Sequence, residues 1–121
     1  MAAHPFVHME LSATDPAASA KFYSEIFGWK IEHDSKFDYY MFSAEGGPGG
    51  GFVKPDGQMY KPGDVIAYIS TDDIEATLKA IEARGGKTVL PKTEIPGIGW
   101  FAFFFDPAGN KLALYTAKGS M

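Results

Sequence analysis

The stretch TDPAASAKFYSEIFGW, residues 14–29, contains the signals of a complete helix and sets a pattern that the chain later repeats. Asp15, or Thr14 beside it, is a good N-cap because its side chain can accept hydrogen bonds from the first backbone N–H groups of a helix. Pro16 suits the first helical position. Gly28 suits the left-handed conformation in which many helices end. We therefore expect an amphipathic helix that begins after Asp15 and ends at Gly28.

The second half of the chain contains the same pattern, with Asp72 as the expected N-cap of a second helix that Gly85 and Gly86 end. Asp15 and Gly28 are 13 residues apart, Asp72 and Gly85 are again 13 apart, and the two aspartates are 57 apart. Each helix is expected to follow one strand and to precede three more. The expected strands are 6–12, 29–34, 38–43 and 51–54 in the first half, and 65–71, 87–90, 100–105 and 111–117 in the second, with a loop at 91–99. This predicts an α+β fold in a single domain, residues 1–121, made of two βαβββ modules, residues 1–60 and 61–121.

The composition excludes several classes of protein. The net charge is −4 and no Lys/Arg run occurs, whereas a protein that binds a nucleic-acid backbone needs a clustered basic face. The chain has no cysteine, which excludes disulfides, thiolate metal sites and cysteine nucleophiles. The longest apolar run, residues 100–105, is far shorter than the roughly 20 residues of a membrane span, and the N-terminus lacks the apolar core of a signal peptide. We expect a cytoplasmic protein that binds neither nucleic acid nor membranes.

Residues 6–11, FVHMEL, show how the first strand divides into two faces. Side chains two residues apart in a strand point to the same side, so His8 and Glu10 share a face. The residues expected to pack against the helices are Val7, Met9 and Leu11, then Val65, Ala67 and Ile69, then Leu112 and Leu114. The residues expected on the other face are Phe6, His8 and Glu10, then Ile66, Tyr68 and Ser70, then Lys111, Ala113 and Tyr115. Because this second face is mixed aromatic and polar, we expect it to line a cleft; the alternative is a face exposed to solvent or buried in a dimer.

His8 and Glu10 are the candidate catalytic residues. An imidazole changes its protonation near neutral pH, so His8 could act as a general base or as a hydrogen-bond donor and acceptor. A carboxylate on the same face, that of Glu10, could orient the ring. The alternative is that His8 is a strand histidine whose hydrogen bonds are satisfied within the fold.

Aromatic side chains are the candidates for binding a ligand. They are Phe52, Tyr68, Trp100 and Tyr115, with Tyr39 and Tyr40 as further members of the class. Tyr68 and Tyr115 are expected on central strands, where their hydroxyls could bind a carbonyl or carboxylate while the rings stack on the ligand. Trp100 follows the sequence IPGIG, which could form a loop that folds over the cleft. For each of these residues, packing in the core is the alternative.

Several of these segments together resemble a known family. HMELSATD and FYSEIFGW in the first half, GGGF, ISTDDIEATLKAIEARGGK, and IPGIGWFAFFFDPAGNKLALY are similar to the glyoxalase / bleomycin-resistance / extradiol-dioxygenase superfamily, also called vicinal oxygen chelate proteins. The resemblance covers nearly the whole chain. It implies that two βαβββ modules form a half-open curved sheet or barrel around a small-molecule cleft, and that the protein is a homodimer.

The resemblance also implies where a catalytic divalent metal would bind. Ligands in metal-dependent members come from the first and last strands of each module. His8, seven residues before Asp15, occupies the first of these positions. The others correspond to Ile66, to Ala113 and to the region of Gly51–Val53, none of which has a ligating side chain. We therefore predict no metal ligands and no cofactor; a divalent ion in a rebuilt site is the alternative.

The expected function follows from this incomplete ligand set. We expect a glyoxalase-like, small-molecule-binding protein that works without metal, either as a pure binder or as an enzyme of the lyase/isomerase type. The alternatives are a metal-dependent lyase with a rebuilt site and a drug-sequestering protein of the bleomycin-resistance kind. The last would suit an acidic protein that binds cationic ligands.

Overall fold

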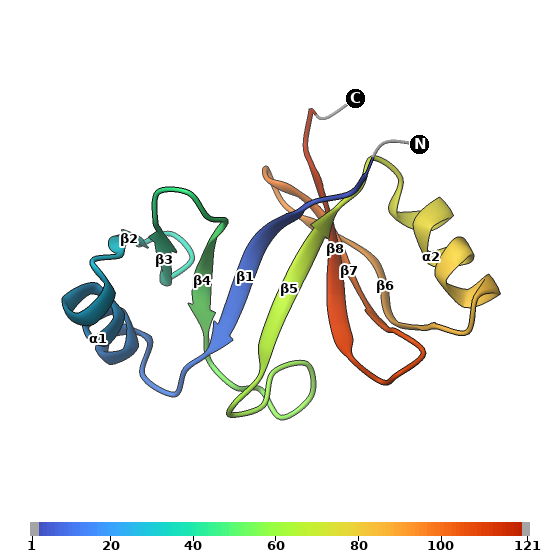
Figure 1. The fold of residues 1–121 in the computed structure, drawn as a ribbon. Helices are drawn as coiled ribbons and strands as arrows, with labels where there is room; N and C mark the ends of the chain where they lie inside the picture. The colour runs from blue at the N-terminus through green and yellow to red at the C-terminus, as the bar shows by residue number, and fades with distance from the viewer. Residues whose placement is uncertain (1–2, 120–121) are drawn as a thin grey trace. The chain divides into compact units, whose positions relative to one another are not determined.

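The computed structural model describes residues 3–119, and these form two compact units. Residues 7–66 make one unit, and the rest of the described chain makes the other; β1 (Phe6–Ser12) and β5 (Val65–Ser70) cross these boundaries, and each is described with the unit that holds most of it. Each unit has one helix and four strands, so the fold is α+β with the predicted order βαβββ occurring twice (Figure 1). Among the described residues, no helix is long and apolar enough to cross a membrane.

The sheet of the first unit has the strand order β2-β3-β4-β1. Its elements are β1 (Phe6–Ser12), α1 (Pro16–Phe27), β2 (Lys30–Asp34), β3 (Tyr39–Ser43) and β4 (Gly49–Val53). Strands β2, β3 and β4 are antiparallel neighbours, whereas β1 and β4, the first and last strands, run parallel. This parallel pair places the beginning of the unit directly against its end.

Helix α1 begins and ends as its sequence predicts. The Asp15 side chain accepts a hydrogen bond from the backbone N–H of Ala18, Pro16 is the first helical residue, and Gly28 has a φ of 71° at the C-cap. The core between the helix and the strands consists of the buried residues Ala13, Ala20, Phe42 and Phe52. Met9 and Leu11 pack against this core, so His8 and Glu10 lie on the opposite face of β1, as alternation predicts.

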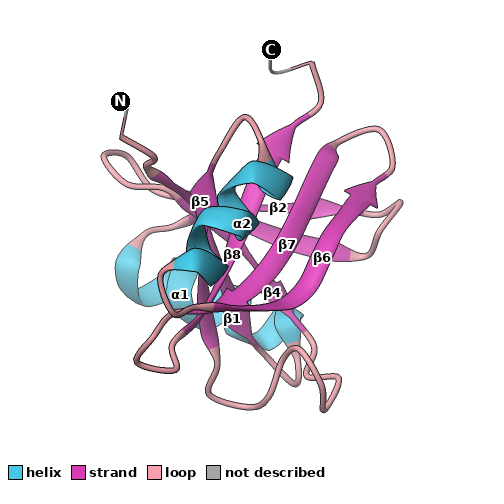
Figure 2. Cartoon of the chain, turned by 90° about the vertical axis from the view of Figure 1, so that its right-hand side faces the viewer, coloured by secondary structure: helices cyan, strands magenta, loops and turns pink. Residues whose placement is uncertain are grey.

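The second unit repeats this arrangement with the strand order β5-β8-β7-β6. Its elements are β5 (Val65–Ser70), α2 (Ile74–Ala83), β6 (Lys87–Ile95), β7 (Gly99–Phe105) and β8 (Lys111–Ala117). Strands β5 and β8 are parallel, and β6, β7 and β8 are antiparallel neighbours. Helix α2 packs on β6, β7 and β8 (Figure 2), over a core of Ile74, Leu78, Ala102, Phe104 and Leu114.

The predicted N-cap of the second helix was wrong by one residue. Asp73, not Asp72, accepts the hydrogen bond from the backbone N–H of Ala76, and its own N–H donates to the Thr71 hydroxyl. Ile74 then becomes the first helical residue and is 1% exposed, because it must face the sheet. The corrected cap lies seven residues after Ile66, as Asp15 lies seven residues after His8, so Ile66 remains the counterpart of His8.

The loop predicted at residues 91–99 was too long, because only residues 96–98 form a turn between two strands. Strand β6 continues to Ile95, and Thr93, Glu94 and Ile95 pair with residues of β7. The register shifts between Leu90 and Thr93, which lets the strand accommodate Pro91 at an irregularity instead of ending there.

Two valines expected against the helices are exposed instead. Val7 is 38% and Val65 is 55% exposed. Val7 is the second residue of β1 and Val65 the first of β5, whereas α1 packs on β2–β4 and α2 packs on β6–β8. The helices therefore do not cover this part of either strand.

Candidate functional site

The pairing of β1 with β4 brings an acidic side chain next to a strand whose first three residues are glycine. Glu10 is directly paired with Gly51, and His8 with Gly49, in the parallel register of these strands. Gly51 has no Cβ, and a Cβ built there would collide with the hydroxyl and ring of Tyr39. Tyr39, from β3, therefore reaches across β4 through the space that Gly51 leaves open.

Three polar groups meet in this space. The Tyr39 hydroxyl donates a hydrogen bond of 2.6 Å to Glu10 Oε2, and His8 Nε2 lies 2.9 Å from the same hydroxyl oxygen. His8 Nε2 also lies 3.1 Å from Glu10 Oε2. The side chain of Glu10 is 9% exposed and that of His8 is 31% exposed. The buried carboxylate is thus held by hydrogen bonds, while the imidazole remains accessible.

The environment of Tyr39 keeps its hydroxyl protonated. Burial raises the pKa of the hydroxyl above its ordinary value of 10.0, and the Glu10 carboxylate, through its charge and its hydrogen bond, raises this pKa further. Nearby Tyr60 acts in the same direction. A phenolate beside a buried carboxylate would place two negative charges together, so the neutral phenol is the stable form.

The sequence did not reveal that Tyr39 belongs with His8 and Glu10. Tyr39 was only one of several aromatic candidates, and it is separated from these residues by about 30 positions. The available signal was the run Gly49–Gly51, which the structure pairs with His8–Glu10. Glycines opposite a strand with polar side chains leave room for a large side chain from a third strand.

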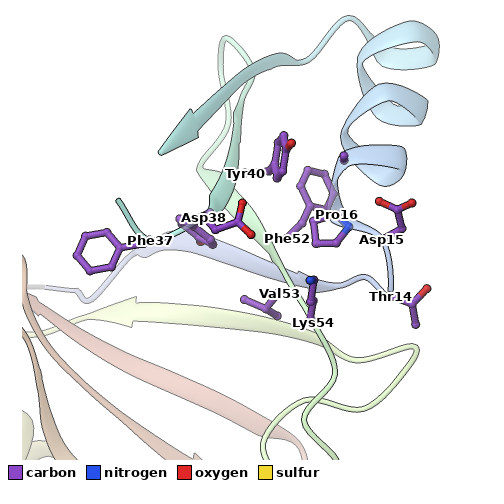
Figure 3. Close-up of a pocket in the computed structure, with 11 residues that line it drawn as sticks. Thr14, Asp15, Pro16, Phe37, Asp38, Tyr40, Phe52, Val53 and Lys54 are labelled. Carbon is purple, nitrogen blue, oxygen red and sulfur yellow. The ribbon is translucent and has the colours of Figure 1, made fainter. Parts of the chain in front are cut away.

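Two hollows adjoin this group of residues. A pocket of about 240 Å³ beside His8 is lined on the same side of the sheet by Lys30, Glu32, Met41 and Gly49, among others. A larger one, of about 670 Å³, lies where α1 begins and β4 ends (Figure 3). Tyr39 lines the larger pocket and His8 the smaller one, so the hydrogen-bonded group has access to both.

Phe52 and Trp100, two predicted ligand-binding residues, pack on the helix-covered faces of their sheets. Phe52 is 2% exposed, and its ring stacks on Tyr23 of α1 with centroids 5.8 Å apart. It also forms part of the wall of the larger pocket, with Tyr40 (Figure 3). Trp100 packs against the core beneath α2, and the ammonium of Lys92 lies 5.1 Å from its ring centroid.

Tyr68 and Tyr115 share the face of the second sheet that α2 does not cover, as predicted. Tyr68 is paired with Ala113 and Tyr115 with Ser70, which places both tyrosines on the same side of the β5–β8 pair. Tyr68 is 6% exposed and meets Phe103 edge-on at 6.2 Å, so most of its ring is packed. Tyr115 is half-buried.

The residues present do not fit the metal ion that the resemblance implies. Between residues 3 and 119, no three His, Asp or Glu side chains lie close enough together to hold an ion. His8 and Glu10 have side chains that can bind a divalent ion, but both are hydrogen-bonded to the Tyr39 hydroxyl. Ile66 and Ala113, at two other ligand positions, are apolar and at most 1% exposed.

Comparisons with known proteins place the chain in a family. The sequence pattern of the Glyoxalase/Bleomycin resistance protein/Dioxygenase superfamily matches residues 6–114. A glyoxylase-like domain-containing protein of Didymella fabae is 34% identical over 119 residues, which cover 92% of each chain. The anthracycline biosynthesis protein DnrV of Streptomyces peucetius is 31% identical over 93% of this chain, and the chain spans only 46% of DnrV.

Solved structures show the same fold at low sequence identity. Methylmalonyl-CoA epimerase from Mycobacterium tuberculosis superposes with a TM-score of 0.71 at 13% identity, covering 93% of this chain and 87% of the epimerase. A superfamily member from Vibrio splendidus superposes with a TM-score of 0.66 at 14% identity, covering 93% of this chain and 98% of that chain. The sequence match and the repeated βαβββ order agree, and the chain belongs to the Glyoxalase/Bleomycin resistance protein/Dioxygenase superfamily.

Proposed function

We propose that this chain binds a small carbonyl compound and moves a proton on it without a metal ion, as an enzyme of the lyase/isomerase type. In this proposal His8 is the general base, and Glu10 orients the imidazole and stabilises its protonated form. The observation that carries it is the hydrogen-bonded group of His8, Tyr39 and Glu10, whose accessible member is the imidazole.

The proposed chemical step is the transfer of a proton from the ligand to His8. A C–H bond next to the carbonyl of the ligand breaks, its electron pair forms an enolate, and the proton moves to His8. The imidazolium that forms lies 3.1 Å from the Glu10 carboxylate, where a buried opposite charge stabilises it. The enolate then takes this proton back from His8 at a carbon atom, or expels a leaving group from the neighbouring carbon, and the leaving group takes the proton from His8.

The pocket beside His8 suggests how a ligand would be oriented. Lys30 and Glu32 line this pocket and provide one cationic and one anionic group. An acidic group on the ligand could bind Lys30 while its carbonyl end lies near His8. The name of the structural neighbour methylmalonyl-CoA epimerase and that of the relative DnrV provide two ligand classes to test, an acyl-CoA and an anthracycline.

The test is exchange of ligand hydrogen for deuterium from heavy water, followed by NMR. We would screen a panel of carbonyl compounds that includes methylmalonyl-CoA and an anthracycline, with a chelator present throughout. A ligand that stabilises the protein against heat should lose its C–H signal, and His8→Ala should slow this exchange by about 100-fold or more. His33→Ala is the matched control, because His33 is exposed, is hydrogen-bonded to Asp38 and lines neither of the two pockets.

Two results would contradict the proposal. Binding without exchange or any product, under all conditions, would identify a sequestering protein instead. Exchange that disappears with the chelator and returns with a divalent ion would identify a metal-dependent enzyme with a rebuilt site.

We also propose that the chain acts as one functional domain, as a homodimer, and in the cytoplasm. Large apolar side chains exposed on α1, those of Phe22, Ile26 and Phe27, support association with another protein surface, since each is more than half exposed. Fractionation of cells that express the tagged chain would check its location.

A further inference from the structure

The three polar atoms of the site form a closed triangle. Its sides are the 2.6 Å bond between the Tyr39 hydroxyl and Glu10 Oε2, the 2.9 Å contact between that hydroxyl and His8 Nε2, and the 3.1 Å contact between His8 Nε2 and Glu10 Oε2. An imidazole and a carboxylate that share one divalent ion each lie about 2.0–2.2 Å from it, and are therefore about 3.0–3.5 Å apart. The spacing of His8 and Glu10 is thus that of two ligands of one ion.

The Tyr39 hydroxyl lies at the third corner of this triangle, against both of these atoms. We infer that Tyr39 takes the place from which a cation would bridge His8 and Glu10, and so makes this site select against divalent cations. Its proton is donated to Glu10 Oε2, and its oxygen contacts His8 Nε2, so each potential ligand atom already has a partner. A cation could enter only by displacing the phenol.

The ring of Tyr39 also occupies the space from which a third ligand could reach an ion. The side chain best placed to add a third ligand is that of residue 51, because this residue is paired directly with Glu10 on β4. Residue 51 is glycine, and the space of its missing side chain is filled by the hydroxyl and ring of Tyr39. The pair Tyr39–Gly51 therefore replaces a possible third ligand with a neutral phenol.

This inference rests on the proposed function only in that both concern a site that works without metal. It explains why His8 and Glu10, although spaced as two ligands of one ion, hold no cation in the proposed reaction. Tyr39 is here a selectivity-determining residue and is assigned no role in the chemical step.

The test measures zinc binding by calorimetry and needs no substrate. The variant Tyr39→Ala/Gly51→Glu removes the phenol and adds a carboxylate opposite Glu10. It should bind about one equivalent of Zn²⁺ at least about tenfold more tightly than the unmodified protein. The matched control is Tyr40→Ala/Gly47→Glu, which removes the neighbouring tyrosine and adds the same carboxylate at a glycine with open space around it. This control should show no gain.

A milder variant keeps the inference testable if the double variant does not fold. In Gly51→Ala the new Cβ must displace the Tyr39 ring, which is the far end of a flexible side chain. Zinc affinity should rise in Gly51→Ala and remain unchanged in Gly47→Ala.

Either of two results would overturn the inference. One is that folded Gly51→Ala and folded Tyr39→Ala/Gly51→Glu bind zinc no more tightly than the unmodified protein. The other is that the unmodified protein already binds one equivalent of zinc, and that His8→Ala abolishes this binding. Neither result depends on turnover, so failure of the proposed reaction is a separate outcome.

Discussion

The Tyr39 hydroxyl contributes to the stability of the fold through its hydrogen bond to Glu10. This hydroxyl donates a hydrogen bond to Oε2 of Glu10, a residue that is 7% exposed. A buried carboxylate that loses such a donor is left with an unmet hydrogen bond, which costs roughly 1–3 kcal/mol. Tyr39→Phe, which keeps the ring and removes the hydroxyl, should therefore destabilise the protein by about this amount at neutral pH.

The pH dependence of this effect has a defined sign. Burial and Glu10 raise the pKa of the Tyr39 hydroxyl in the folded protein, whereas in the unfolded chain it returns to its ordinary value of 10.0. Above pH 10 the unfolded chain loses this proton and the folded protein keeps it, so the stabilisation is present below pH 10 and is lost as pH rises. The slope is at most about 1.4 kcal/mol per pH unit.

Urea unfolding of the unmodified protein and of Tyr39→Phe, at several values from about pH 9 to about pH 11, would measure this slope. The stability advantage of the unmodified protein should shrink above pH 10. If the two proteins lose stability in parallel, the environment assigned to Tyr39 is wrong.

Among the elements, β4 can accept only glycine at positions 50 and 51 without displacing a neighbour, because other residues approach it closely on both faces. Gly51 leaves space for Tyr39 on one face. On the other, a Cβ at Gly50 would collide with the backbone carbonyl oxygen of Met9 and with the ring of Phe42. The collision at Gly51 involves the movable side chain of Tyr39. The collision at Gly50 involves the backbone of β1, which cannot move without breaking the parallel pair.

Gly50→Ala should therefore be much more damaging to the fold than Gly51→Ala or Gly47→Ala, because neither of these would collide with backbone. We expect it to lower the free energy of unfolding by about 1–3 kcal/mol or more, since overpacking against backbone cannot be relieved by rotamer changes. Gly47→Ala, in the turn before β4 and in open space, should be close to neutral. Chemical denaturation of the two variants checks this, and equal stability of Gly50→Ala and Gly47→Ala would contradict the strand packing described for β4.

How well the sequence predicts which residues of a strand face the helix differs from strand to strand. In β1, apolar and polar residues alternate, so the shared face of His8 and Glu10 could be inferred from sequence alone. In β7, residues 100–105 are apolar on both faces, so their pattern does not indicate that Trp100 packs beneath α2. For Phe52 the deciding fact is its pairing with Leu11 across the parallel strands, a long-range register that local patterns do not contain.

The helices were predicted well because their signals are local. Asp15, Pro16 and Gly28 lie in sequence next to the groups that they cap or end. In the second helix two consecutive aspartates compete for the cap, and burial of Ile74 decides for Asp73. The role of Tyr39 could not be predicted, because it depends on a space created by Gly51 on a different strand.

At the scale of the whole molecule, the proposed homodimer can be tested by mass. The chain has a mass of 13.1 kDa, and light scattering coupled to size exclusion should give twice this value at micromolar concentration. Several large apolar side chains of the described residues are exposed, and association would remove some of them from water. A mass of 13.1 kDa over the whole concentration range would contradict the dimer.

The fit between Tyr39 and Gly51 also has a consequence for how such a site can change during evolution. A larger residue at position 51 collides with Tyr39, and a smaller residue at 39 leaves a void beside Glu10 and an unmet hydrogen bond. Either substitution alone is therefore disfavoured, while the two together restore a filled site. Among homologues, these two positions should vary as a pair, with bulk at one accompanied by a small residue at the other.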